Sequence, residues 1–179
     1  PLVAAVSASA PAVQLDLRPG GTLDMVEQLD RGDLDLTLGT MGSPGERFAT
    51  APLLQDGFVI VMRRGHPASR RKLSATAFAA LSHLEISSTR EDTGFIDRWL
   101  AERGLTRRIA LRAPYLSAAP ILVQSDLVAT LSQRIAQEFV RHHPLQLCKP
   151  PFESPTVMTT MLWHRRLDRH PAHRWLRGV

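Results

Sequence analysis

The chain has 179 residues, of which 44% are hydrophobic, and a formal net charge of +5 from 22 lysines and arginines against 17 acidic residues. This length suffices for one domain or two small lobes around a sizeable core, and the composition excludes a disordered chain. The basic residues are scattered without interleaved aromatic residues, and the sequence has no helix-turn-helix, zinc-finger or RNA-binding signature. The positive charge therefore indicates a solvated surface rather than a nucleic-acid-binding module.

The cysteine content and the hydropathy indicate the cellular compartment in which the protein is expected. Cys148 is the only cysteine, so no intramolecular disulfide can form, as is usual in a reducing cytoplasm. We expect it to be a small hydrophobic residue at a strand end. No run of 18 apolar residues exists to cross a membrane, and the apolar stretch at residues 1–6 lacks a basic flank and is too short for a signal peptide. We expect a cytoplasmic protein.

The first third of the chain predicts helices and strands in alternation. Residues 2–10 are typical of the end of a helix, and residues 12–17 alternate as in a strand. Thr22 is a good N-cap for an amphipathic helix that runs to residue 31, and Gly32 supplies the left-handed residue that stops it. The leucines of residues 34–38 then predict a strand, which a loop over residues 40–51 follows.

The remainder continues the alternation to the end of the chain. In order it predicts a buried strand at 58–62, a turn at 65–67, a helix capped by Ser74, a strand at 84–87, a helix at 95–103 stopped by Gly104, a strand at 107–111, a helix capped by Ser117 that runs through 123, a strand at 127–131, a helix capped by Ser132, a strand at 145–148, a strand at 157–163 and a helix at 172–176. Such alternation predicts an α/β fold with right-handed crossovers and mainly parallel sheets.

Several segments share a resemblance. The pattern Leu29-x-x-Gly32-Asp33-Leu34-Asp35-Leu36 resembles a signature of the effector-binding domain of LysR-type transcriptional regulators. Further segments resemble the same domain in its order, at residues 11–17, 52–61, 66–67, 122–131 and 163–176. The last of them is similar to the closing stretch of a subgroup that includes nodulation regulators. Ser132 stands where the family usually has a proline, which leaves the start of the following helix open.

The resemblance implies two α/β lobes joined by two crossing strands, the fold of type 2 periplasmic binding proteins. Lobe I would hold about residues 1–56 and 152–179, and lobe II about residues 57–151. The family places a strand ahead of Pro1 and a DNA-binding helix-turn-helix domain further upstream. We therefore expect a fragment that contacts DNA only through an N-terminal domain absent from this sequence.

Hydroxyl side chains recur where such a fold binds ligands, after strands and at helix starts. The resemblance adds weight to the threonines among them, although a purely structural role as helix caps or polar connectors is the alternative for each. The candidate effector-binding residues are Thr22, Thr40, Met41, Ser88, Thr89, Thr93, Tyr115 and Ser117. Free amides at helix starts favour an anion, so we expect an effector with a carboxylate or a phenolate.

Catalytic and metal-binding patterns are absent from the sequence. It contains no glycine-rich phosphate loop and no nucleophile elbow, and the adjacent His142 and His143 would point to different sides. We therefore expect neither enzymatic activity nor a cofactor nor a metal. Two alternatives stay open, a periplasmic solute-binding protein of the same fold and a small α/β enzyme.

The resemblance also implies partners. These are a small-molecule effector, further copies of the chain in a dimer or tetramer, and DNA through the missing domain, with RNA polymerase as a further candidate and no membrane. The predicted helices at 23–31 and 95–103 are the candidate interface elements. An effector that prefers one lobe arrangement would shift the population toward it.

Overall fold

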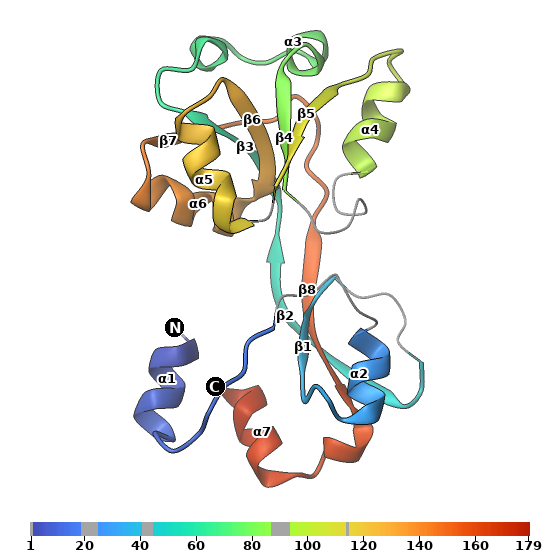
Figure 1. Ribbon diagram of the computed structural model, residues 1–179. Coiled ribbons are helices and arrows are strands. Elements are labelled where there is room, and N and C mark those ends of the chain that lie inside the picture. The colour runs from blue at the N-terminus through green and yellow to red at the C-terminus, as the bar shows by residue number, and fades with distance from the viewer. Residues whose placement is uncertain (1, 19–24, 41–44, 87–93, 114) are drawn as a thin grey trace. The chain divides into compact units, whose positions relative to one another are not determined.

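A computed structural model describes residues 2–18, 25–40, 45–86, 94–113 and 115–179. The chain divides into two compact units, unit 1 with Pro1–Leu54 and Met158–Val179, and unit 2 with Gln55–Val157. The chain passes between the units within strand β2 (Phe48–Asp56) and at the start of strand β8 (Val157–His164). Each unit is described by itself below (Figure 1).

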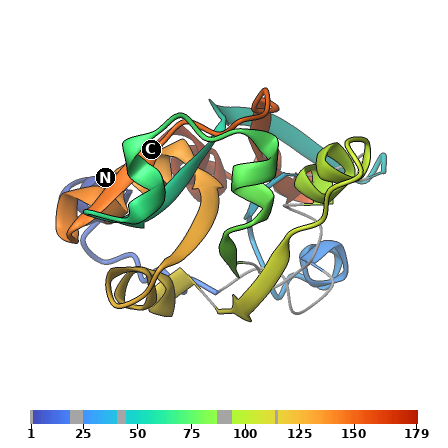
Figure 2. The same cartoon turned by 90° about the horizontal axis from the view of Figure 1, so that it is seen from above.

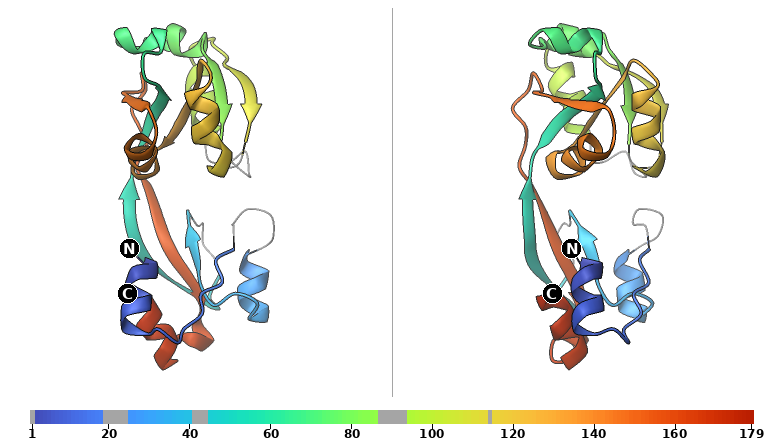
Figure 3. Two further views of the ribbon diagram at one scale, coloured as in Figure 1. Left: turned by 60° about the vertical axis from the view of Figure 1, so that its left-hand side comes forward. Right: turned by 90° about the vertical axis from the view of Figure 1, so that its left-hand side faces the viewer.

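Unit 1 is a three-stranded sheet with helices beside it. The sheet order is β1-β8-β2, and β1 (Thr37–Gly39) pairs antiparallel with β8. The helices are α1 (Leu2–Ser9), α2 (Met25–Arg31) and α7 (Pro171–Gly178). Figure 3 shows α1 and α2 on different sides of β1. Leu29, Phe48 and Leu162 form the core of this unit.

Helix α2 ends as the sequence predicts. Gly32 has a φ of +87°, and the backbone N–H groups of Gly32 and Asp33 both donate to the carbonyl of Gln28. The guanidinium of Arg166 donates to the carbonyls of Leu29 and Asp30, which the helix itself leaves without partners. The predicted helix end at Gly32 is confirmed. The contact with Arg166 was not predicted, because this arginine lies near the other end of the chain.

Unit 2 is built on a five-stranded sheet in the order β5-β4-β6-β3-β7. Its elements are β3 (Phe58–Arg63), a 3-10 turn (Pro67–Arg70), α3 (Ala75–Ala79), β4 (Ser82–Glu85), α4 (Gly94–Ala101), β5 (Arg108–Arg112), α5 (Tyr115–Val123), β6 (Leu127–Ser132), α6 (Gln133–His142) and β7 (Leu145–Cys148). Seen from above in Figure 2, α4 and α5 lie on different sides of β4 and β5.

Both faces of the unit 2 sheet are buried. Val61 and Leu131 belong to the core under α5 and α6, and Ile60 and Met62 belong to the core under α3 and α4. A strand that is covered on both faces needs apolar side chains at successive positions, which explains the continuous run at residues 58–62. The predicted buried strand is therefore confirmed.

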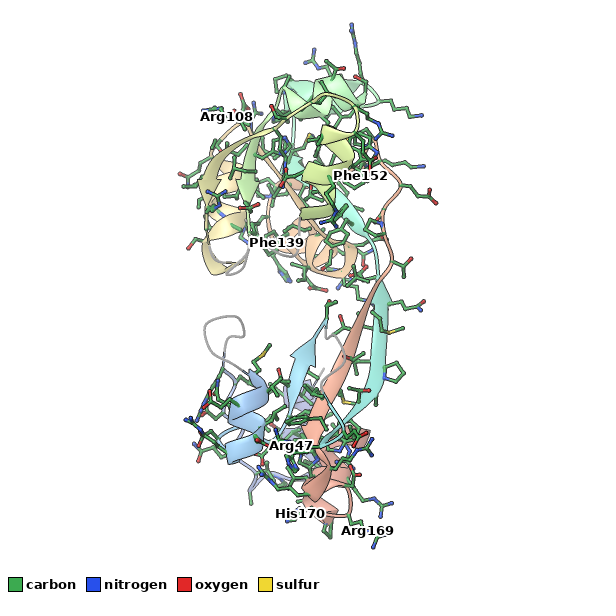
Figure 4. All side chains as sticks on the ribbon, turned by 90° about the vertical axis from the view of Figure 1, so that its right-hand side faces the viewer. Arg47, Arg108, Phe139, Phe152, Arg169 and His170 are labelled. Atoms are coloured by element: carbon green, nitrogen blue, oxygen red, sulfur yellow. The ribbon has the colours of Figure 1, made fainter. Side chains whose placement is uncertain are left out.

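Aromatic rings fill the core beside α4. The ring of Phe152 lies 5.5 Å from the rings of Phe95 and Trp99 and 5.7 Å from that of Phe78, measured between centroids. Figure 4 labels Phe152 beside α4. Phe152 belongs to the segment that returns toward unit 1, and its burial fastens that segment to unit 2.

The α/β class is confirmed, but the prediction of mainly parallel sheets is wrong. β4 pairs in parallel with β5 and β6, whereas β3 pairs antiparallel with β6 and β7, and β1 antiparallel with β8. The crossover rule fixes the direction of strands that a helix connects, here β4, β5, β6 and β7. β3 directly follows β2, in which the chain enters unit 2, and β8 follows the return to unit 1, so no parallel crossover sets their direction.

Three local predictions also need correction. Residues 12–17 form no strand, because Val13 and Leu17 are exposed and no described strand pairs with this segment. β2 begins at Phe48, inside the predicted loop. Ser117 is the third residue of α5 and not its cap.

Other helix and strand signals are confirmed. Ser74 caps α3, since its hydroxyl accepts from the N–H of Ala77 at 3.1 Å. Gly104, with a φ of +66°, follows α4, and β7 spans the predicted residues. Among the helices of the described part of the chain, none is both long enough and apolar enough to cross a bilayer.

Candidate functional site

Three strand ends and two helix starts meet at one edge of unit 2. β4, β5 and β6 are parallel, so their carboxyl ends, at Glu85, Arg112 and Ser132, lie at the same edge of the sheet. α5 and α6 begin directly after β5 and β6. We call this region the carboxyl edge. Strand carboxyl ends and helix amino ends are where open α/β sheets bind ligands, because the first amides of each helix are free to donate.

A buried carboxylate organises the carboxyl edge. Glu85 is only 6% exposed, and its Oε2 accepts a hydrogen bond of 2.6 Å from the Nε of Arg112. The Nη2 of Arg107 lies 3.7 Å from its Oε1, and the Arg107 side chain is 2% exposed. Arg107 in turn donates to both oxygens of Asp97 in α4, at 2.6 and 3.1 Å. Charges at such depth are retained only when they are paired, and here they tie β4, β5 and α4 together.

His83 lies two residues before Glu85 and is buried at 1% exposure. Its Nε2 donates to the carbonyl of Phe78 at 3.0 Å, which fixes the neutral tautomer because a carbonyl can only accept. Burial lowers the pKa of His83 to about 4, and the nearby positive charge of Arg107 acts in the same direction, while the Phe78 carbonyl opposes both. The Nδ1 of His83 and the hydroxyl of Thr130 are buried without a hydrogen-bond partner among the described residues. His83 is therefore neutral near pH 7.

The amino end of α6 is closed by an acid from the strand that enters unit 2. Asp56 accepts from the N–H of Arg134 at 3.0 Å and from that of Gly57 at 2.9 Å. The N–H of Gln133 donates to the carbonyl of Gly57 at 2.8 Å. Ser132 occupies the predicted cap position, but its side chain makes no capping hydrogen bond. The free amides of α6 are thus partly used by the protein itself.

A polar cavity of about 460 Å³ adjoins this helix end. Amide and charged side chains line most of it, with little apolar surface to hold a hydrophobic ligand. Its lining is Gln55, Asp56, Gly57, Gln133, Arg134, Gln137 and Thr156. A second, larger groove runs beside the return segment and has apolar residues such as Phe58, Leu73 and Phe152 in its wall. Both cavities belong to unit 2, and the sequence reasoning identified neither.

Most of the predicted effector-binding residues lie outside the described part of the chain, namely Thr22, Met41, Ser88, Thr89 and Thr93. Tyr115 opens α5 at the carboxyl edge, and Ser117 is exposed on the same helix. Thr40 is exposed directly after β1 in unit 1. The predicted effector contacts therefore stay a prediction.

Sequence reasoning missed Glu85 and Arg112. The signal that could have found Glu85 is an acidic residue between Leu84 and Ile86, since an acid within an apolar run is seldom buried without a partner. The sequence could not predict that Arg112 is the partner of Glu85, because this pairing depends on the register between β4 and β5.

The described residues hold no group of three or more histidine, cysteine or acidic side chains that could bind a metal ion. Cys148 is half-buried at the end of β7, and burial raises the pKa of its thiol. This keeps the thiol protonated and unreactive near neutral pH.

Comparison with known proteins identifies the family. A family model described as the LysR substrate binding domain matches residues 1–179. The chain is 30% identical to the transcriptional activator NagR of a Ralstonia species, over all of this chain and 60% of NagR. It is 26% identical to nodulation protein D 1 of Bradyrhizobium diazoefficiens, over 99% of this chain and 57% of that protein. The chain thus spans less than two thirds of the length of these relatives.

Comparison with solved structures points to the same family. The regulatory domain of MexT, a transcriptional activator in Pseudomonas aeruginosa, matches with a TM-score of 0.88 and 25% identity over 99% of this chain and 88% of that one. The relatives are regulators of transcription and not enzymes, and they do not favour the alternative of a periplasmic solute-binding protein. Sequence, fold and comparisons together show that the chain belongs to the LysR substrate-binding domain family, with relatives that include nodulation regulators.

Proposed function

We propose that this chain is the sensing and oligomer-forming part of a LysR-type transcriptional regulator, and that it binds a small organic anion between its two units. The observation that carries the proposal is the carboxyl edge, where two helix amino ends follow parallel strands in a domain of this family. Positive helix ends and free amides favour a carboxylate or a phenolate. Thr40, Thr89 and the other predicted contacts would supply hydroxyl donors.

Sensing would work by a shift between two arrangements of the units, which would act as the two lobes. An effector shifts such an equilibrium only by the difference between its affinities for the two states. Moving a population from mostly off to mostly on requires about 5 kcal/mol of that preference, and a graded response requires less. The strands β2 and β8, in which the chain passes between the units, would be the hinge.

The response would reach DNA through a twin subunit. Two copies that pair about a two-fold axis use the same surface on each, and helices α2 and α4 are the proposed interface elements. A DNA-binding domain ahead of this chain would then receive the change, with RNA polymerase as a further proposed partner.

A thermal-shift screen of small organic acids, each beside its neutral amide, tests the sensing proposal. A ligand that binds only the folded chain raises its melting temperature by mass action. We expect acids to stabilise the chain more than their amides, and substitution of Thr40 or Thr89 by valine to weaken the best acid. Stabilisation by the neutral compounds alone would contradict an anionic effector.

Sedimentation of the chain over a range of concentrations tests the pairing. We expect a dimer that dissociates on dilution. A chain that stays strictly monomeric at high concentration would rule out the twin-subunit route.

A further inference from the structure

Arg112 presents an unused pair of hydrogen-bond donors at the carboxyl edge. It is the last residue of β5, two positions before the segment that opens α5. Its Nε donates to Glu85, and neither of its terminal nitrogens has a partner among the described residues. Its side chain is 54% exposed. Within the described part of the chain, the Nη1 and Nη2 groups are therefore left to bind a ligand.

The contact with Glu85 orients this guanidinium. Because the carboxylate is 6% exposed and held in the core, it fixes the Nε edge of Arg112 against the sheet. A planar guanidinium whose Nε edge is fixed still offers two parallel N–H donors at its far end, and this fork matches the two oxygens of a carboxylate. Less side-chain freedom is then lost when a ligand binds.

The charges nearby leave Arg112 able to attract an anion. Arg112 is not the only cation paired with Glu85, since the Nη2 of Arg107 lies 3.7 Å from the other oxygen of Glu85. The buried carboxylate is thus shared by two cations, and Arg107 is further paired with Asp97. These four side chains together carry no net charge, so an anion would be held by the exposed terminal nitrogens of Arg112 themselves, beside the start of α5, where the helix dipole is positive.

Arg108 provides a contrast within the same strand. It lies at the opposite end of β5, and its Nη2 donates to the hydroxyl of Ser82 at 2.7 Å. Figure 4 labels it on the outside of unit 2. No buried acid among the described residues orients Arg108, so charge alone does not distinguish the two arginines. The two arginines differ in their position along β5 and in whether a buried acid orients them.

We propose that Arg112 is the anchor for the carboxylate of the effector, which it binds end-on through its two terminal nitrogens while Glu85 holds its Nε. This rests on the proposed sensing function and names the residue that selects acids over their neutral analogues. Glu85 is a positioning residue here, and Arg107 offsets its charge.

The test compares the chain with the variants Arg112→Gln, Arg112→Lys and, as the matched control, Arg108→Gln. The probes are benzoate, phenylacetate and cinnamate, each beside its primary amide, with dissociation constants measured by calorimetry or by the shift in melting temperature. Circular dichroism checks that each variant is folded. Arg112→Gln removes one of the two cations paired with the buried Glu85, so we expect it to lower the melting temperature of the free chain, whereas Arg112→Lys keeps a cation there.

We expect Arg112→Gln to weaken the best carboxylate by about 10- to 100-fold and to change the affinity for the matching amide by less than about twofold. Arg112→Lys keeps the charge but loses the fork, so it should restore only part of the affinity. Arg108→Gln should change neither ligand.

Three outcomes would overturn the inference: carboxylate affinity kept in Arg112→Gln, equal losses for acid and amide, or binding of none of the three carboxylates to the unaltered chain. The first two leave the sensing function standing, because a ligand still binds. Binding of amides with no binding of acids would remove the anionic effector as well.

Discussion

The carboxylate of Asp56 accepts a hydrogen bond of 3.0 Å from the backbone N–H of Arg134, although 78 positions separate the two residues. Asp56 ends the strand that enters unit 2, and Arg134 lies in the first turn of α6. The acid thus acts as an N-cap from outside the helix, at the place where the Ser132 side chain makes no capping hydrogen bond.

Replacing this acid should weaken unit 2. We expect Asp56→Ala to lower the free energy of unfolding by about 1 kcal/mol, the usual loss when a helix cap is removed. Ser132→Ala should change it by less than about 0.5 kcal/mol, because that hydroxyl caps nothing. Urea denaturation followed by circular dichroism measures both. A larger effect for Ser132→Ala than for Asp56→Ala would show that the serine is the true cap.

The stability should fall in mild acid because of His83. Its pKa is about 4 in the folded chain and near 6.5 when unfolded, so the unfolded state binds an extra proton between these values. The contribution of His83 is full above pH 6.5 and is lost as the pH falls toward 4, by about 3 kcal/mol in total. Unfolding free energies measured from pH 7 to pH 4 should therefore decline less steeply in His83→Gln. Equal slopes for both proteins would contradict this.

Gly32 should tolerate a side chain worse than Gly45 does. Both have a φ of +87°, so alanine is strained at either position. At Gly32 the added Cβ would also lie 3.0 Å from the Nη2 of Arg166, which is bonded to α2, whereas at Gly45 no described atom lies within 4 Å. We expect Gly45→Ala to cost about 1 kcal/mol and Gly32→Ala clearly more. Thermal unfolding of the two variants measures the difference, and equal losses would mean that Arg166 moves aside freely.

Phe152, between β7 and β8, should be sensitive to truncation of its side chain. It is 5% exposed and contacts the rings of Phe78, Phe95 and Trp99. Phe152→Ala should lower the free energy of unfolding by about 3 to 4 kcal/mol, and Phe152→Leu by about 1.5 kcal/mol, because leucine fills most of the volume. Denaturation followed by tryptophan fluorescence provides the readout. Losses below 1 kcal/mol for both would mean that the segment is not fastened here.

The sequence alone predicted most elements, since their signals are local. A glycine that ends α2, a serine that caps α3 and an apolar run that becomes β3 each depend on a few neighbouring residues. The order of the family segments along the chain likewise predicted the LysR fold, which the comparisons confirm. The strand expected at residues 12–17 failed because a strand also needs a partner beside it.

What only the tertiary structure decided is which distant residues meet. The direction of β3 depends on how the chain enters unit 2, the cap of α6 comes from Asp56, and Arg112 finds Glu85 through the register of two strands. None of these follows from a local pattern, because each depends on the packing of segments that are far apart in sequence. The hydroxyl residues predicted for the effector site were chosen by position along the chain, whereas the charged pair at the carboxyl edge became visible only once the strands lay side by side.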